Sequence, residues 1–175
     1  MAKSSFLIAA AVAVSVAVVI LPSSVVCGAR VAPTNGFTVN GRVFCDTCVA
    51  GFETPATTYV AGAQVRVECR TRDTKAKTCS FDGVTDSTGT YNIQVAGEHE
   101  YEICESVLVS SPDGDCSLPL MGRERAPVLL THNNGMPSDT RVVNALGFKK
   151  NAPLAWCASL MKMYEVDEDY RIIFG

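Results

Sequence analysis

The chain has 175 residues, of which 47% are hydrophobic and 19% are charged, and its formal net charge at pH 7 is −3. The 15 Lys and Arg side chains are outnumbered by 18 Asp and Glu and form no basic stripe, which argues against binding to nucleic acid or to an anionic membrane. At this length one domain with a real hydrophobic core is expected.

Residues 1–29 are predicted to be a secretory signal peptide that is removed. Lys3 precedes the apolar run Phe6–Leu21, Pro22 ends that run, and the small residues Cys27–Ala29 follow. This is the order of a basic region, an apolar core and a cleavage site. The apolar run is short for a membrane span of about 20 residues. A retained membrane anchor is the alternative interpretation.

The remaining residues, 30–175, are expected to form a single secreted domain in the extracellular space or cell wall. Its core is predicted to extend over about residues 37–163, and residues 165–175 are interpreted as an acidic tail. An oxidising compartment and seven remaining cysteines favour disulfide bonds.

The first strand is predicted over residues 38–44, because Phe37, Val39, Val43 and Cys45 in and beside it follow a period of two. Cys45 and Cys48 follow in the sequence C-D-T-C. If the extended backbone continues, these two side chains point to opposite faces, because side chains alternate along a strand and three is odd. Each cysteine is then expected to be tied to a different part of the protein.

The same C-x-x-C spacing also occurs in redox dithiols and in zinc sites. A redox site needs the pair at the start of a helix in a βαβ unit, but Gly51 follows closely and no such alternation surrounds it. A closed zinc site needs four ligands. The chain has no second C-x-x-C, and its two histidines, His99 and His132, are far apart in the sequence. Structural disulfides are therefore favoured, and we expect no metal and no cofactor.

Two more segments of the middle chain have clear strand patterns. Residues 63–70 alternate between apolar and polar side chains, which is typical of a half-buried strand in an antiparallel sheet. Residues 84–95 are predicted to form strand, turn and strand, with Asp86 and Gly89 supplying the turn.

The later strands are shorter. A strand at residues 101–110 is predicted to contain a bulge near Cys104. Residues 126–131 and 140–145 are predicted to be strands joined by the turn-rich segment 132–139. Short strands separated by turns predict an all-β protein, a small antiparallel β-barrel or sandwich of about seven strands.

A short C-terminal helix is also predicted. Asn151 is expected to cap it, with Pro153 in its first turn. One face carries apolar residues at helical spacing, which we interpret as core packing. These residues are Leu154, Cys157, Leu160, Met161 and Tyr164.

The segment G-R-V-F-C-D-T-C-V-A-G-F at residues 41–52 resembles the signature of the pollen Ole e 1 allergen and extensin family. The signature residues are Gly41, Val43, Cys45, Asp46, Cys48, Gly51 and Phe52. The order and spacing of six cysteines also resemble this family, as do Gly89-x-Tyr91 and the segment Asn144–Phe148. The sequence departs from the family pattern at Val49, where arginine is usual, and at Ala145, where proline is common. It also has an extra Cys79 and no N-x-[ST] sequon.

The resemblance implies an antiparallel β-barrel or sandwich closed by the disulfides Cys45–Cys116, Cys48–Cys157 and Cys69–Cys104. It further implies a secreted plant protein that acts in pollen or cell-wall growth. The partners that it implies are a receptor-like kinase ectodomain or a cell-wall polysaccharide. No catalytic residues are established for the family, so none is assigned to this chain.

Cys79 is expected to be unpaired if Cys27 leaves with the signal peptide and the other six cysteines pair. It lies in the polar segment 74–80, so exposure and a Cys79-linked dimer or a small-thiol adduct are predicted. The alternatives are a partly buried, unreactive thiol, or a bridge between Cys27 and Cys79.

No group of residues favours an enzyme. Asp113, Asp115 and Glu124 are spaced like ligands of a calcium loop, but Leu118 occupies the position that needs glycine, so a solvated turn is predicted. His99 and His132 are expected to be surface histidines rather than catalytic bases.

The sequence therefore predicts an extracellular binding or signalling protein. The alternative is a structural component of the cell wall or a carbohydrate-binding module. A carbohydrate module needs exposed aromatic side chains, and Tyr59 and Phe81 are the loop aromatics to consider, because the single tryptophan, Trp156, is expected to pack beside Cys157.

Overall fold

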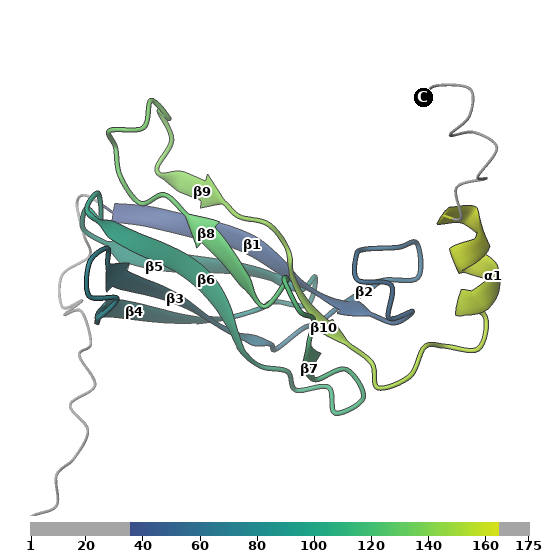
Figure 1. Cartoon of the computed structure of the whole chain (residues 1–175). Helices are drawn as coiled ribbons and strands as arrows, with labels where there is room; N and C mark the ends of the chain where they lie inside the picture. The colour runs from purple at the N-terminus through teal and green to yellow at the C-terminus, as the bar shows by residue number, and fades with distance from the viewer. Residues whose placement is uncertain (1–35, 165–175) are drawn as a thin grey trace, which may run out of the picture.

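The computed structural model describes residues 36–164, and within them two β-sheets pack face to face as a sandwich (Figure 1). The predicted signal peptide and acidic tail lie outside the described residues. The all-β fold with a short C-terminal helix is confirmed, and the sandwich is the form that it takes. Among the described residues, no helix is long and apolar enough to cross a membrane.

The first sheet is built on the long strand β1, which pairs with two strands along its first half and with two others along its second half. Its first half pairs antiparallel with β5 and parallel with β9, and its second half pairs antiparallel with β2 and parallel with β10, whose far edge carries β7. The strands are β1 (Gly36–Asp46), β2 (Thr58–Tyr59), β5 (Thr90–Ala96), β7 (Leu118–Pro119), β9 (Thr140–Val142) and β10 (Leu146–Lys149).

The second sheet is antiparallel throughout, in the order β4-β3-β6-β8. Its strands are β3 (Gln64–Thr71), β4 (Lys77–Val84), β6 (Glu102–Ser110) and β8 (Arg125–Val128). The alternation that predicts β3 corresponds to its burial, because Val65, Val67 and Cys69 are fully buried. These side chains meet those of β1 and β5 in the core between the sheets.

One close approach in this core requires a glycine. Tyr91 on β5 is fully buried, and its hydroxyl forms a hydrogen bond of 2.8 Å with Ser106 on β6, in the opposite sheet. A Cβ at Gly41 would lie 2.3 Å from that hydroxyl oxygen. Burial raises the pKa of Tyr91 to about 12. Gly41 of the signature therefore makes room for a neutral tyrosine that links the two sheets.

The segment 84–95 is a crossing between sheets and not a hairpin. β4 pairs with β3, and β5 pairs with β1. The turn with Asp86 and Gly89 is present, since Asp86 accepts hydrogen bonds from the Thr88 and Thr90 amides. The turn residues determine where the chain changes direction. They do not determine whether the two flanking strands join the same sheet.

The predicted bulge near Cys104 is also misplaced. Cys69 and Cys104 stand directly opposite each other, and the register between β3 and β6 shifts only at Gln64 and Val65, opposite the end of β6. Cys104 and Ser106 both face the core. The buried Ser106 stands where an apolar residue would be expected, so the alternation of apolar and polar residues along β6 looks interrupted in the sequence.

The C-terminal helix is shorter than predicted. The helix α1 (Cys157–Met161) begins after Trp156, with no side-chain cap, and a 3₁₀ turn (Lys162–Tyr164) follows. Asn151 is therefore not the cap. Trp156 does not pack into the core, because 52% of it is exposed. The apolar face instead forms a second small core of Cys48, Ala56 and Cys157, covered by Leu154, Leu160 and Met161.

Three disulfides staple the described residues, and they are the three pairs that the resemblance implies. The Cα–Cα distances are 6.1 Å for Cys45–Cys116, 5.3 Å for Cys48–Cys157 and 4.1 Å for Cys69–Cys104. The extended backbone does not continue to Cys48, since β1 ends at Asp46 and a turn follows. The turn, and not strand alternation, directs Cys48 to the C-terminal helix.

The prediction that Cys79 is unpaired and exposed is wrong. Cys79 takes part in a disulfide and is only 7% exposed, and no cysteine of the described part of the chain is free. The physical reason is that residues 77–84 form β4, which places Cys79 and Phe81 in the core beside Cys69. The other six described cysteines form the three bridges given above. The structure therefore gives no support to a Cys79-linked dimer.

Candidate functional site

Two polar segments meet at the end of the sandwich where β1 begins (Figure 1). They are the turn that leads from β5 to the first residue of β6, residues 97–102, and residues 131–139 of the connection between β8 and β9; together we call them the loop end. The His99 amide donates to the Leu130 carbonyl at 2.8 Å. The Thr38 amide donates to the Asp139 carbonyl at 3.0 Å. The turn is therefore tied to the chain that leaves β8, and the longer segment is anchored to β1.

Glutamates of the turn hold the longer segment in place. Glu98 accepts hydrogen bonds from the Thr131 hydroxyl at 2.8 Å and from the His132 amide at 2.7 Å. Glu100 accepts one from the Asn133 side chain at 3.1 Å. The donation from the His132 amide is the main cause that lowers the pKa of Glu98. These carboxylates therefore serve first as internal acceptors.

His132 is a surface histidine, as predicted, but it lies between two carboxylates. Its Nδ1 is 2.7 Å from Glu98 Oε2, and its Nε2 is 3.2 Å from Asp139 Oδ1. The ring also packs on Phe37, with centroids 4.5 Å apart. The hydrogen bond with Glu98, aided by the one with Asp139, raises the pKa of His132. The geometry stabilises the imidazolium form.

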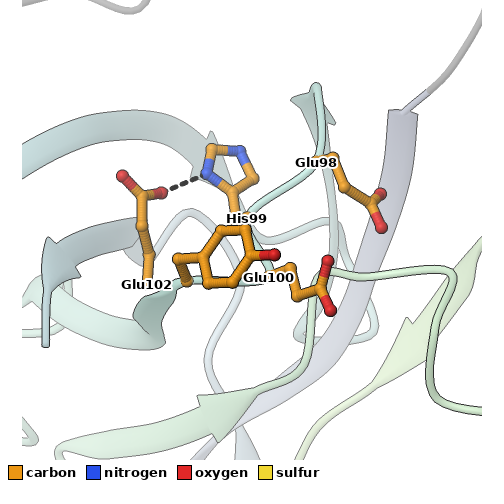
Figure 2. A pocket seen from close by; sticks show the side chains of 5 residues that line it. Glu98, His99, Glu100 and Glu102 are labelled. Carbon is orange, nitrogen blue, oxygen red and sulfur yellow. Dashed lines mark hydrogen bonds and ion pairs between the residues drawn. The ribbon is translucent and has the colours of Figure 1, made fainter.

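His99, by contrast, is not a surface histidine. It is 8% exposed, and its ring meets Phe81 edge-on. Its Nδ1 bonds Glu102 (Figure 2). Its Nε2 is 3.1 Å from the Ala96 carbonyl oxygen, which can only accept. Burial raises the pKa of Glu102, but hydrogen bonds from Thr78 and His99 outweigh it and lower that pKa. The His99–Glu102 pair joins the two ends of the turn between β5 and β6.

A set of metal-ligating residue types surrounds this pair. The donor atoms of Cys69, His99, Glu102 and Cys104 lie within 4.8 Å of one another. The two sulfurs, however, are joined in a disulfide, and a thiolate is the form of cysteine that binds metals. The side chains of His99 and Glu102 already bond each other. The donor set therefore does not fit a metal ion while the disulfide is intact.

A shallow pocket of about 290 Å³ opens on the turn, lined by residues 98–102 (Figure 2). Tyr101 is 80% exposed. The carboxylates of Glu98 and Glu100 lie on one side of the pocket, while Glu102 turns toward His99 on the other. The pocket thus presents an aromatic ring beside negative charge.

Arg141 ties the loop end to its flanking strands, and this role was not predicted from the sequence. Its buried guanidinium donates to the carbonyls of Leu129 at 3.0 Å, of Thr131 at 2.9 Å, and of Ser138. It also lies 4.6 Å from the centre of the Phe37 ring. One cation therefore ties β9 of the first sheet to the chain that leaves β8 of the second. No local pattern marks this arginine, because its partners are carbonyls.

The C-D-T-C block lies at the opposite end of β1 and has a structural role. The fully buried Asp46 carboxylate accepts from the amides of Cys48 at 3.2 Å, Ala50 at 3.0 Å and Gly51 at 2.7 Å. Gly51 has φ +90°, a conformation that glycine adopts without strain. The signature is thus a turn wound around one carboxylate, with Phe52 packing edge-on against Tyr164.

Neither of the aromatic residues considered for carbohydrate binding forms an open platform. Phe81 is buried in β4 and is not a loop residue. Tyr59 is partly exposed on β2, but the Arg42 guanidinium covers its ring at 3.6 Å, and its hydroxyl donates to Glu53 at 3.1 Å. The segment at Asp113 forms a local turn, in which Asp113 accepts from the Asp115 amide at 2.9 Å.

Comparison with known proteins places this geometry in a family. The family described as "Pollen protein Ole e 1 like" matches residues 35–165. The chain is 48% identical over 133 residues to "Pollen-specific protein C13" of Zea mays, covering 76% of this chain and 78% of that protein. It is 44% identical over 138 residues to "Pollen allergen Sal k 5.0101" of Kali turgidum, covering 75% and 91% respectively.

A solved structure has the same fold. The crystal structure of the major plantain pollen allergen Pla l 1 superposes with a TM-score of 0.62 at 33% sequence identity. The match covers 69% of this chain and 98% of that one.

Proposed function

Because the chain belongs to the family of Ole e 1-like pollen proteins, we propose that it is a secreted, non-catalytic binding or signalling protein. It acts in pollen tube or cell-wall growth through an extracellular partner. The partner is a receptor-like kinase ectodomain or a component of the cell wall. The observation that carries this proposal is the rigid, polar loop end at one end of a disulfide-stapled sandwich.

The loop end suits recognition better than chemistry. Glu98 and Glu100 accept hydrogen bonds from the longer segment and hold the two segments together, while Glu102 is paired with His99 inside the turn. Both histidines are held by carboxylates, and within residues 36–164 neither forms a hydrogen bond with a hydroxyl or thiol that would serve as a nucleophile. Variable loops on a rigid scaffold are a common binding surface.

Between the two kinds of partner, the exposed groups favour a protein. An exposed tyrosine beside carboxylates offers aromatic area with a polar rim, which is typical of protein interfaces. A carbohydrate-binding module commonly presents an open aromatic face, and Tyr59 is covered by Arg42. The structural wall component or carbohydrate module remains the second candidate, supported by the half-exposed Trp156.

The test compares the purified, oxidised protein against a panel of receptor-kinase ectodomains and a glycan array. We expect an ectodomain to bind, and Tyr101→Ala to weaken that binding by roughly tenfold or more, as for a central aromatic contact. Met121→Ala is the matched control, because Met121 is 92% exposed and follows β7, at the other end of the sandwich. Binding to glycans alone, or equal losses in the two variants, contradicts the proposal.

A further inference from the structure

His132 closes the base of an eight-residue segment, residues 132–139. Its Nε2 reaches Asp139 at 3.2 Å, so the first and last residues of the segment are joined through one ring. Between them lie Asn133, Asn134, Gly135, Met136, Pro137 and Ser138, most of them exposed. Gly135 has φ +75°, in the tight turn at the tip.

The two contacts of His132 require two protons on the ring. Ionised carboxylates only accept hydrogen bonds, and a neutral imidazole has one N–H and one lone pair. Because Nδ1 faces Glu98 and Nε2 faces Asp139, the neutral ring must turn its lone pair toward one of these carboxylates. Only the imidazolium can donate to both.

Of the two contacts, the one with Asp139 is the weaker link. Glu98 stays attached to residues 131 and 132 through the Thr131 hydroxyl and the His132 amide, whatever the charge of the ring. The contact of His132 with Glu98 is also shorter than its contact with Asp139, 2.7 Å against 3.2 Å. The neutral ring therefore keeps its N–H toward Glu98 and points its lone pair at Asp139.

The charged groups around His132 come from several elements. The turn between β5 and β6 contributes Glu98 and also Glu100, which bonds Asn133. Asp139 belongs to the segment itself. Opposing cations are Arg141 of β9, which lies over the same Phe37 ring, and Arg72, which donates to the Glu100 carbonyl. The two carboxylates that touch the ring, Glu98 and Asp139, favour its proton.

The geometry points to a pH-sensitive clasp: protonated His132 holds the segment 132–139 closed through Asp139, and loss of the proton releases this contact, while Arg141 still donates to the carbonyls of Thr131 and Ser138. Since this segment belongs to the loop end, any effect on binding rests on the proposed function. The clasp itself needs no partner.

The direction in which the clasp responds to pH follows from the raised pKa of His132. The protonated ring is the form that the folded protein favours. The clasp is therefore fully closed below the ordinary pKa of 6.5, and it opens as the pH rises through the raised value in the folded protein. The protein is expected to present a more ordered loop end below the raised pKa of His132 than above it.

The test is an NMR titration of the intact, oxidised protein between about pH 5 and 9, across the range in which histidine titrates. The ring signals of His132 report its pKa, and amide protection factors of residues 133–136 report the order of the segment. We expect the pKa to lie above 6.5. Protection should fall by about two- to fivefold across that pKa, as for an exposed ion pair.

Two variants make the test specific. In His132→Gln, the pH dependence of protection at residues 133–136 should disappear. In Asp139→Asn, the side-chain amide can donate to the lone pair or accept from the N–H, so the contact survives in both states and protection should stay constant with pH. A lower pKa of His132 is also expected in that variant.

Unchanged protection across the titration of His132 in the parent protein would overturn the clasp. So would a pH dependence that persists in His132→Gln, since it would then come from a group other than His132. Neither result bears on whether an ectodomain binds, so failure of the clasp and failure of the proposed function are separate outcomes.

Discussion

A single carboxylate, that of Asp46, explains why the C-D-T-C block has its form. It is fully buried and accepts three backbone amides of the turn that leads to Cys48 and Gly51. Buried polar groups need such partners, because an unpaired donor in a protein interior is costly. The aspartate therefore shapes the turn that carries Cys48 to Cys157.

Replacing Asp46 should therefore destabilise the protein. Asp46→Ala leaves three amides without an acceptor, and a loss of about 1–3 kcal/mol in the free energy of unfolding is expected. Asp113→Ala is the control, since Asp113 accepts an amide in an exposed turn, and its effect should stay within about 0.5 kcal/mol. Urea unfolding of both variants measures the difference; equal stability of the two would refute the role given to Asp46.

At the scale of strands, the pattern of side chains predicted some elements and missed others. Residues 63–70 were predictable because the buried face of β3 carries only apolar side chains. β4 was missed because Cys79 and Phe81 alternate with Thr78, Ser80 and Asp82, so the segment resembles a polar loop. Cys79 and Phe81 are buried only because β4 joins the second sheet and that sheet packs on the first, which the local sequence does not show.

The loop end was beyond prediction for a different reason. His132 and Glu98 are 34 residues apart, and Arg141 bonds carbonyls 10 and 12 residues before it. Such contacts depend on which strands lie side by side, and carbonyl acceptors leave no trace in the side-chain sequence. The family resemblance supplied the disulfides but not the environment of either histidine.

Arg141 should control the attachment of β9. Arg141→Leu keeps apolar volume over Phe37 but removes the donors to the carbonyls of residues 129, 131 and 138. A loss of about 1.5–3 kcal/mol is expected, as for hydrogen bonds from a charged group. Faster hydrogen exchange should appear in residues 129–131 and 138–142.

Arg125→Leu is the control for that substitution. Arg125 forms an exposed ion pair with Glu105 at 3.1 Å, on β8 and β6. Exposed pairs contribute about 0–1 kcal/mol. If the two leucine variants lose the same stability, Arg141 does not have the bridging role described above.

For the whole molecule, the disulfides are expected to supply much of the stability. The bridges close separations of 35, 71 and 109 residues. Each contributes about 2–5 kcal/mol, against a net stability of about 5–15 kcal/mol for a typical domain. Full reduction should therefore lower the melting temperature sharply. A reduced protein that melts within a few degrees of the oxidised one would contradict this view.

The central claim concerns which end of the sandwich makes contact with the partner, and hydrogen exchange of the complex tests it most directly. The ectodomain selected from the panel is mixed with the oxidised protein, and amide exchange is compared with that of the free protein. We predict protection at residues 97–102 and 131–139, with little change around α1 and the segment at Met121. Protection confined to α1 and its neighbours, with none at the loop end, would contradict the account.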